Sequence, residues 1–445
     1  MAGSETRFPL EDLARRVRAA AVSLPFATPK GLVRSVSPSA VAIEGLSHWL
    51  RLGSFVEISV QGGTTLAEVI RLEKDVVLCK PFDVTAAIEL DAPAYPAGEQ
   101  LFHPDNSWKG RIIDALGRPA DSKSSLRPGN RSVRLHATPP SAMSRQLIGK
   151  GILTGVRVID TFTPICLGQR IGIFAGSGVG KSSLLSMLAN GGGFDVVVVS
   201  LVGERGREVR EFVELTLGDA AASAITVVST GDESAMMRKM APLRATAIAE
   251  YFRDEGANVL LLMDSVTRYA HACREVALAA GEPPVARGYP PSVFSLLPQL
   301  LERAGPGTNG TGTITAFYAV LVDGDDHNDP VADAVRGTLD GHIVLSRRIA
   351  SQGRLPAVDL LSSLSRLSQR VWSADQAKVI SELRKLVDRF EDSRDLRAMG
   401  GHVAGADAEL DRAVEVVPKL YRLLSQSPSE PRSVDGFAEI AKGLL

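Results

Sequence analysis

The spacing of hydrophobic and polar residues changes along the chain and divides it into segments of different structure. Between about residues 31 and 95, apolar and polar positions alternate in short runs that glycine and serine turns separate. Alternation with period two is typical of strands with one buried face, and several such strands at this spacing predict a small β-barrel. The runs are 32–36, 40–44, 54–60, 66–72 and 75–80.

Further along, the apolar residues form continuous runs of strand length, and segments with helical spacing lie between them. Continuous apolar strands are typical of sheets buried on both faces, and their alternation with helices predicts a parallel sheet in an α/β domain. Residues 96–150, rich in proline, glycine and serine, are interpreted as a link into this domain. The apolar runs are 171–174, 194–202, 224–229 and 258–264.

Helical spacing without strands marks both ends of the chain. Apolar residues recur at helical spacing over 8–24, with arginines on the remaining surface, which predicts an amphipathic helix within residues 1–25. This helix either docks onto a partner or an anionic membrane, or folds onto its own domain. At the other end, Ser373 and Gln376 form a capping-box pattern before an apolar helical face, and further helices follow.

The first apolar run of the α/β domain leads into a glycine-rich turn and then into a helix-forming segment. A phosphate group needs several backbone N–H groups that converge on one anion, and glycine allows the backbone conformations that this requires. Lys181 can reach the β- and γ-phosphates, and the Ser182 hydroxyl can bind Mg²⁺. Ala175 stands where the strict phosphate-loop motif has glycine. We therefore predict a nucleotide-binding loop made of Ala175, Gly176, Ser177, Gly178, Val179, Gly180, Lys181, Ser182 and Ser183.

Two further strands should bring carboxylates to the same edge of the sheet. One apolar run is followed by Glu204 and Arg205, and another ends on Asp264. Ligands of open α/β sheets bind at the carboxyl ends of the strands. Glu204 is therefore the candidate base that activates water, and Arg205 is a candidate for neutralising the charge that develops during phosphoryl transfer. A carboxylate that closes a buried strand is costly unless a cation meets it, which places Asp264 near the Mg²⁺ that Ser182 binds.

Composition and charge exclude several classes of protein. The 445 residues include 50 Lys and Arg against 51 Asp and Glu, so the basic surplus of many nucleic-acid-binding proteins is missing. Within residues 26–95, six basic residues face eight acidic ones without an aromatic cluster, so we expect no nucleic-acid partner. Cys79, Cys166 and Cys273 are too few and too far apart for a disulfide framework or a zinc site, which favours a reducing cytoplasm. No apolar run has the length of a membrane span.

Five stretches of the sequence carry a resemblance to one family. The stretches are TGVR at 154–157, GERGREV at 203–209, LLLMDSVTRYA at 260–270, GEPPVARGYPPSVFSLLPQLLERAG at 281–305 and TITAFYAVLVDGDDHNDPVAD at 313–333. By these stretches the chain resembles the type III secretion ATPases, which are relatives of the rotary ATP synthases, and among them most closely the flagellar export ATPases. The likeness extends from about residue 30 to 425.

The resemblance implies a division into an N-terminal helix (1–25), a β-barrel (26–95), a RecA-like phosphate-loop ATPase domain (96–365) and a helical C-terminal domain (366–445). It further implies a homo-hexameric ring that hydrolyses ATP with Mg²⁺ at sites between subunits. In such a ring Arg366 would be supplied to the site of the neighbouring subunit. Family members usually carry an aromatic residue that stacks on adenine where this chain has Leu355, so a stacking contribution on the order of 1 kcal/mol is lost.

The same resemblance implies the partners and the location. We expect a stator-type regulator at the N-terminal helix, and a central stalk protein, an export gate, export substrates and chaperones elsewhere. We also expect a cytoplasmic protein with peripheral contact at the inner face of the inner membrane. The preferred function is ATP hydrolysis that energises flagellar protein export. The alternatives are the ATPase of a virulence injectisome, a catalytic subunit of a proton-translocating ATP synthase, and a structural subunit that binds nucleotide without hydrolysing it.

Overall fold

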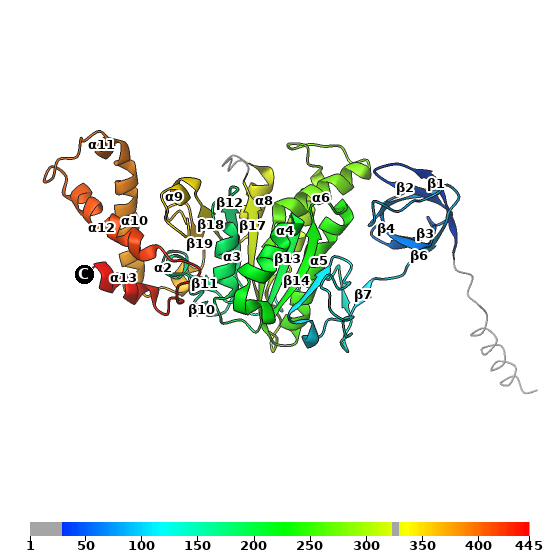
Figure 1. The fold of residues 1–445 in the computed structure, drawn as a ribbon, viewed down its shortest axis with the longest axis horizontal. Helices are drawn as coiled ribbons and strands as arrows, with labels where there is room; N and C mark the ends of the chain where they lie inside the picture. Colours follow the sequence, from blue (N-terminus) through cyan, green and yellow to red (C-terminus); the bar gives the residue numbers. More distant parts are fainter. Residues whose placement is uncertain (1–28, 323–328, 445) are drawn as a thin grey trace, which may run out of the picture. The chain divides into compact units, whose positions relative to one another are not determined.

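The computed structural model describes residues 29–322 and 329–444, and the predicted helix within residues 1–25 lies outside them. The described chain divides into two compact units, coloured along the sequence in Figure 1. The first unit ends at Glu99. The second contains the residues from Gln100 onward, together with the short stretch Phe82–Val84.

The first unit is a closed antiparallel β-barrel, as the alternating pattern predicts. Inward side chains such as Val33, Ile43 and Val56 are fully buried and form its core. The alternation did not indicate β6, because prolines stand at both of its ends, yet this strand closes the barrel by pairing with β1 and β3. In spatial order the strands are β1 (Gly31–Val36), β2 (Val41–Glu44), β5 (Val76–Pro81), β4 (Gly63–Leu72), β3 (Phe55–Val60) and β6 (Pro93–Pro96).

The second unit is built on a nine-stranded sheet. From β18 to β8 the neighbouring strands run parallel, so the carboxyl ends of β12, β13 and β15 reach the same edge. β19 pairs antiparallel with β18 at one end of the order, and β16 pairs antiparallel with β17. In spatial order the strands are β19 (Leu364–Ser365), β18 (Gly341–Leu345), β12 (Arg170–Ala175), β17 (Thr313–Leu321), β15 (Asn258–Asp264), β13 (Val196–Glu204), β14 (Ala224–Thr230) and β8 (Arg111–Asp114), with β16 (Gly305–Pro306) beside β17.

The segment interpreted as a link also contributes to the sheet. β8 pairs with β14 at the edge of the order, and its four residues are too few for a periodic pattern to reveal. Two short ladders lie outside the main sheet. β7 (Leu101–Phe102) pairs with β9 (Val133–Arg134), and β10 (Gly151–Ile152) pairs with β11 (Ile165–Cys166).

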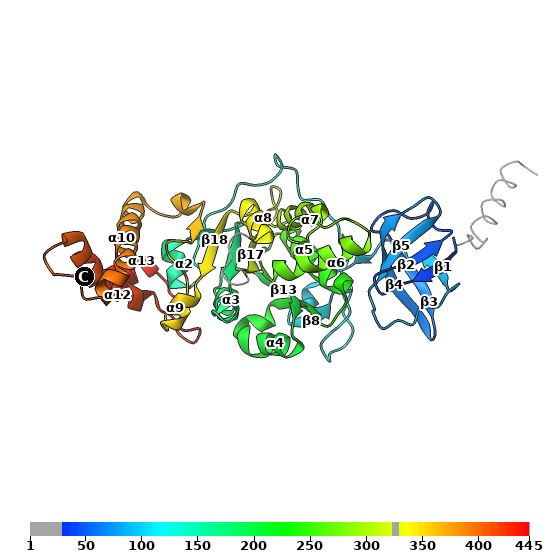
Figure 2. The same ribbon diagram turned by 90° about the horizontal axis from the view of Figure 1, so that it is seen from above.

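Helices cover both faces of the sheet, as the alternation of strands and helices predicts. Figure 2 shows α3 and α4 on one face, and α5, α6, α7 and α8 on the other. After α4 the backbone continues as a π-turn over Phe212–Thr216 and a 3₁₀ turn over Gly218–Ala222. The helices of this region are α2 (Arg157–Phe162), α3 (Lys181–Ala189), α4 (Gly206–Glu211), α5 (Ala235–Asp254), α6 (Val266–Ala279), α7 (Pro291–Leu301), α8 (Pro330–Thr338) and α9 (Arg347–Ser351).

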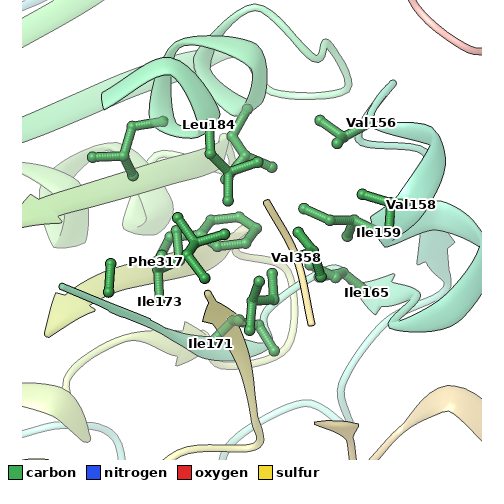
Figure 3. Close-up of a cluster of buried hydrophobic side chains, with 14 of the residues drawn as sticks. Val156, Val158, Ile159, Ile165, Ile171, Ile173, Leu184, Phe317 and Val358 are labelled. Carbon is green, nitrogen blue, oxygen red and sulfur yellow. The ribbon is translucent and has the colours of Figure 1, made fainter. Parts of the chain in front are cut away.

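A hydrophobic core fixes α3 against the sheet. Figure 3 shows Ile171 and Ile173 of β12, Phe317 of β17 and Leu184 of α3 in one cluster, and each is at most 1% exposed. Burial of a side chain of this size contributes about 1.5–3 kcal/mol. The strand and the helix on either side of the glycine-rich turn are therefore held firmly, which sets the position of the turn.

The chain ends in a group of helices that share this core. Ser373 and Gln376 form the predicted capping box at the start of α10, and Ile380 and Val417 face the same hydrophobic cluster as β12 and α3. The helices are α10 (Ala374–Asp392), α11 (Arg394–Ala398), α12 (Ala408–Leu424) and α13 (Gly436–Leu444). In the parts of the chain that the structure describes, no helix is both long and apolar enough to cross a bilayer.

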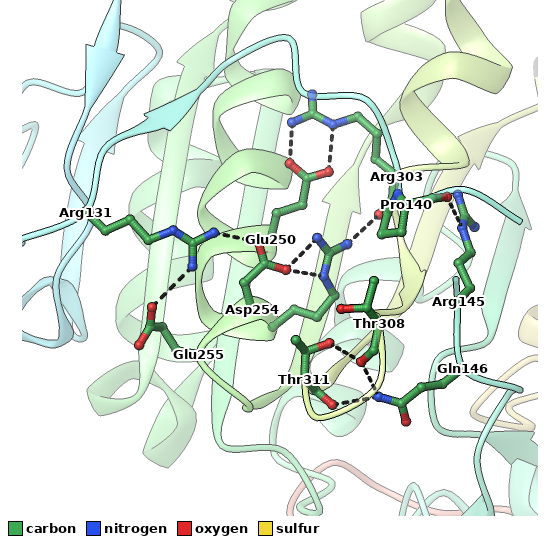
Figure 4. A network of polar contacts seen from close by, with 11 residues as sticks. Arg131, Pro140, Arg145, Gln146, Glu250, Asp254, Glu255, Arg303, Thr308 and Thr311 are labelled. Atoms are coloured by element: carbon green, nitrogen blue, oxygen red, sulfur yellow. Dashed lines mark hydrogen bonds and ion pairs between the residues drawn. The ribbon is translucent and has the colours of Figure 1, made fainter. Parts of the chain in front are cut away.

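Ion pairs and hydrogen bonds hold the residues on either side of β9 onto the rest of the α/β domain (Figure 4). Arg303 forms two hydrogen bonds of 3.0 and 2.6 Å with the Glu250 carboxylate of α5, and both side chains are buried. Arg303 also donates to the Leu135 carbonyl at 2.7 Å. Nearby, Arg131 reaches Asp254 at 2.8 Å. The buried pair thus joins α5 to a segment that has little secondary structure of its own.

Candidate functional site

The glycine-rich turn between β12 and α3 has the geometry that phosphate binding needs. Gly178 and Gly180 have φ angles of 76° and 92°, in the left-handed region that favours glycine. Gly180 is the N-cap residue of α3, so the first N–H groups of that helix lie beyond a residue without a side chain to cap them. Ser177, Gly178, Ser182 and Ser183 are exposed, whereas Ala175 is buried where β12 ends. The loop therefore presents uncapped N–H donors at the positive end of a helix dipole.

A pocket of about 690 Å³ opens at this loop. It is lined by most of the predicted loop residues and by Glu204, Arg205 and Asp264 from the ends of β13 and β15. Neighbouring parallel strands bring these carboxylates together, since β13 pairs with β15. The pocket thus joins the predicted loop to the predicted acidic residues, as expected for the carboxyl edge of an open sheet.

Lys181 lies between the two acidic side chains. Its ammonium donates a short hydrogen bond to the Asp264 carboxylate. The Glu204 carboxylate lies 3.8 Å from the same Nζ atom. Asp264 is only 6% exposed, and a carboxylate buried to this extent needs a cation. In this arrangement the lysine supplies that positive charge at the floor of the pocket.

The electrostatic surroundings of Glu204 make its ionised form less favourable than that of an ordinary glutamate. Burial disfavours the charged carboxylate, and the negative charge of Asp264 adds to this, so the pKa of Glu204 lies above its usual value. Lys181 and Arg268 oppose the shift, and a hydrogen bond with Glu208 strengthens it. A raised pKa brings a carboxylate closer to the range in which a general base works best.

The two arginines of the pocket differ in exposure. Arg205 is 73% exposed and forms an ion pair of 3.1 Å with Glu208. Arg268, which the sequence reasoning did not single out, also lines the pocket and packs along Gly203. Its Nε is buried and has no hydrogen-bond partner in the described part of the chain. The sequence feature that could have indicated Arg268 is its position in the first turn of the helix that follows Asp264.

The remaining predicted residues lie at different distances from the loop. Leu355 is close to it, because a Cβ atom added to Gly180 would lie 3.7 Å from Leu355 Cδ2. This side chain is 45% exposed, so it can contact a ligand. Arg366 directly follows β19, is exposed, and does not line the pocket of its own chain. Leu355 therefore lies beside the phosphate loop and Arg366 does not, and neither side chain lines the pocket itself.

The oxygen atoms at the site suit Mg²⁺ bound together with phosphate groups. Mg²⁺ is usually held by one or two carboxylates, substrate phosphates and water, and not by a cage of protein ligands. The Ser182 hydroxyl and the buried Asp264 carboxylate both line the pocket and are ligands of this kind. Among the described residues no group of three or more His, Cys, Asp or Glu side chains could hold a metal ion. The donor set therefore fits a metal that arrives with the nucleotide.

Two protein-family models match segments of the second unit. The nucleotide-binding domain of the ATP synthase alpha/beta family matches residues 155–365. The C-terminal domain of the type III secretion ATPase EscN matches residues 372–439.

Curated relatives and solved structures match over nearly the whole chain. The flagellum-specific ATP synthase of Rhizobium meliloti (strain 1021) is 53% identical over 416 residues, which cover 94% of this chain and 89% of the relative. The type 3 secretion system ATPase of Xanthomonas euvesicatoria is 42% identical over 414 residues, with 92% of each chain covered. The structure of assembled EscN from enteropathogenic E. coli matches with a TM-score of 0.87 and 40% identity, over 93% of this chain and 100% of EscN. EscN in complex with its central stalk EscO matches with a TM-score of 0.84 and 39% identity, over the same shares of the two chains.

These matches confirm the resemblance that the sequence motifs indicated and the predicted class of fold. The barrel, the parallel sheet and the terminal helices occur in the same chain as both family domains. The chain therefore belongs to the ATP synthase alpha/beta family, in the group that contains the flagellum-specific ATP synthases and the type III secretion ATPases.

Proposed function

We propose that this chain binds ATP with Mg²⁺ in the pocket at the phosphate loop and hydrolyses it to ADP and phosphate. The observation that carries the proposal is the position of Lys181, which lies at the start of α3 with Asp264 and Glu204 on either side. A cation at a helix N-terminus attracts phosphate groups, and a carboxylate beside it can act on water. Membership of an ATP synthase family supports the same reaction.

In this proposal the loop and three side chains hold the substrate. The backbone N–H groups from Gly176 to Ser183 surround the phosphates, and Lys181 contacts the β- and γ-phosphates. Ser182 and Asp264 would hold Mg²⁺, which neutralises phosphate charge when it is bound. Binding of phosphates and Mg²⁺ would give Lys181 and Asp264 new partners in place of each other.

Glu204 and Arg205 carry the proposed chemistry. Glu204 accepts a proton from the water that attacks the γ-phosphate, and its raised pKa makes it a stronger base than an ordinary glutamate. Arg205 is exposed at the mouth of the pocket, where it can turn from Glu208 towards the developing negative charge. The proton-transfer step alone contributes about 10²–10⁴-fold to such reactions.

A ring of six subunits would complete the site. Arg366 is exposed and lies outside the pocket of its own chain, as a residue delivered to a neighbouring subunit must. An arginine supplied from another subunit stabilises transition-state charge and makes hydrolysis depend on assembly. The assembled structure of EscN supports the ring, and the EscN complex with EscO supports a central stalk as a partner.

The proposed biological role is to energise flagellar protein export. The identity of 53% to a flagellum-specific ATP synthase, against 42% to a type 3 secretion system ATPase, favours flagellar export over an injectisome. A stator-type regulator at the N-terminal helix, an export gate, export substrates and chaperones belong to the same proposal. So does a place at the cytoplasmic face of the inner membrane. A catalytic subunit of a proton-translocating ATP synthase is a further alternative, and such a subunit should co-purify with a membrane rotor.

Steady-state ATP hydrolysis by the purified chain tests the proposal. Wild type should hydrolyse ATP, Glu204→Gln should lose at least about 100-fold in kcat while still binding ATP, and Lys181→Ala should lose binding. In the native cell, Glu204→Gln should abolish the export of flagellar proteins. Hydrolysis by Glu204→Gln at the wild-type rate would refute the catalytic assignment. A wild-type chain that binds ATP without hydrolysing it would favour a structural subunit.

A further inference from the structure

The segment that carries Leu355 is held by the C-terminal helices and not by the sheet alone. Arg354, the preceding residue, places its guanidinium 3.7 Å from the centre of the Tyr421 ring on α12. Arg354 also lies 3.9 Å from the Glu391 carboxylate on α10. Leu355 itself is held through its carbonyl oxygen, which accepts a hydrogen bond of 2.8 Å from the backbone N–H of Gln426. We call Arg354, Glu391, Tyr421 and Gln426 the base-side clamp.

The members of the base-side clamp support one another. The Tyr421 hydroxyl donates a hydrogen bond of 2.7 Å to Glu391, and Arg348 of α9 pairs with the same carboxylate at 3.0 Å. Burial and the hydrogen bond with Glu391 raise the pKa of Tyr421, so the hydroxyl keeps its proton. Arg354 and Glu391 are only 18% and 16% exposed. Partial burial strengthens both contacts of Arg354, the one with the aromatic ring and the one with the carboxylate, relative to the same contacts at the surface.

Gln426 ties the clamp to the far end of the phosphate-loop helix. Its buried side chain accepts from the Arg157 N–H and donates to the Gly155 carbonyl, both at 2.9 Å. Residues 154–157 lie against the end of α3, since a Cβ atom added to Gly191 would lie 2.3 Å from the Thr154 carbonyl oxygen. Gln426, which follows α12, therefore contacts both the segment that carries Leu355 and the stretch 155–157 beside the end of α3.

We infer that Arg354 and Tyr421 are positioning residues for the base of the nucleotide: the C-terminal helices, through the base-side clamp, hold Leu355 against the base. The inference rests on the proposed function, because it takes Leu355 as the contact of the base. Leucine lacks the fixed stacking geometry of an aromatic ring, so its contact depends on how firmly its backbone is placed. Loss of the clamp should therefore weaken the contact with the base and leave the contacts with the phosphates intact.

The test compares ATP with inorganic triphosphate, which has the phosphates and no base. Dissociation constants for both ligands are measured with Mg²⁺ on the full chain as wild type, Tyr421→Leu, Tyr421→Phe and Arg422→Ala. The substitution Tyr421→Leu removes the aromatic ring beneath Arg354. We expect this variant to bind ATP about fivefold more weakly than wild type and to bind triphosphate with unchanged affinity. Tyr421→Phe keeps the ring and should retain most of the affinity for ATP. Arg422 is exposed on the same helix, so Arg422→Ala is the matched control and should bind both ligands like wild type.

The outcomes separate the inference from the proposal on which it rests. Equal weakening of ATP and triphosphate in Tyr421→Leu would mean a general effect on the domain, and unchanged ATP binding would mean no effect; either overturns the inference. If Tyr421→Leu does not fold, Glu391→Gln decides with the same two ligands, because it keeps the shape of the side chain and removes the charge. A wild-type chain that binds neither ligand would instead overturn the proposed nucleotide site. In hydrolysis assays the inference predicts a higher KM for ATP in Tyr421→Leu with little change in kcat.

Discussion

At the scale of single residues, the site depends on charges that lie close together in a partly buried place. Lys181 has two carboxylates as neighbours, and only Asp264 contacts it directly. Glu204 is left with a weaker attraction to the lysine and a repulsion from Asp264, which together with burial raises its pKa. This difference between two nearby carboxylates suits one for binding a cation and the other for accepting a proton.

The raised pKa of Glu204 predicts the pH dependence of hydrolysis. A general base must be ionised, so kcat/KM should fall as the pH decreases through the pKa of Glu204 in the free protein. Because that pKa is raised, the fall should occur at a higher pH than the value of about 4.3 for an ordinary glutamate. Glu208→Ala removes a hydrogen bond that raises the pKa of Glu204, so the decrease of kcat/KM at low pH should occur at a lower pH in this variant than in wild type. A decrease of wild-type kcat/KM at the pKa of an ordinary glutamate would contradict this account.

At the scale of elements, patterns along the chain revealed long or regular segments and missed short ones. β15 begins and ends at the residues where its apolar run does, and the capping box marked the start of α10. β6 and β8 were missed because each has four residues, and prolines obscure the first. Both elements take their place from partners distant in the sequence, which no local pattern records.

The site divides in the same way between local and distant signals. The loop, Glu204 and Asp264 could be predicted because each lies at the carboxyl end of a strand in the parallel sheet. The carboxyl ends of such strands meet at one edge, where ligands bind. The proximity of Leu355 to Gly180 and of Arg354 to Tyr421 arises from packing between segments far apart in the sequence. Arg268 was missed because a single arginine in the first turn of a helix is an ordinary surface feature until the pocket is seen.

The buried pair of Arg303 and Glu250 should contribute strongly to the stability of the second unit. Arg303→Ala leaves Glu250 as a buried charge without its partner, and loss of one member of a buried pair costs about 3–5 kcal/mol. We expect a clear decrease in the temperature of unfolding of this unit, measured by calorimetry. Glu214→Ala breaks the exposed pair with Arg210 and should leave that temperature nearly unchanged. Equal effects of the two substitutions would show that burial of the first pair is unimportant.

At the scale of the whole molecule, one chain contains most of the proposed catalytic site and also Arg366, which does not line the pocket of its own chain. The pocket contains the phosphate loop and both carboxylates, whereas Arg366 is exposed elsewhere on the surface of the second unit. The family to which the chain belongs includes a protein solved as an assembled ATPase. Sites shared between subunits explain both observations, and they are the central claim of the proposed mechanism.

Mixing two inactive variants tests that claim most directly. Glu204→Gln lacks the base and keeps Arg366, whereas Arg366→Ala keeps the base and lacks the arginine. Each alone should be inactive under conditions that promote assembly. The account predicts that a mixture regains ATP hydrolysis, because an Arg366→Ala subunit can take its arginine from a Glu204→Gln neighbour, and that the regained activity rises with protein concentration. Full activity of Arg366→Ala alone, or no recovery in a mixture that does assemble, would contradict the shared site.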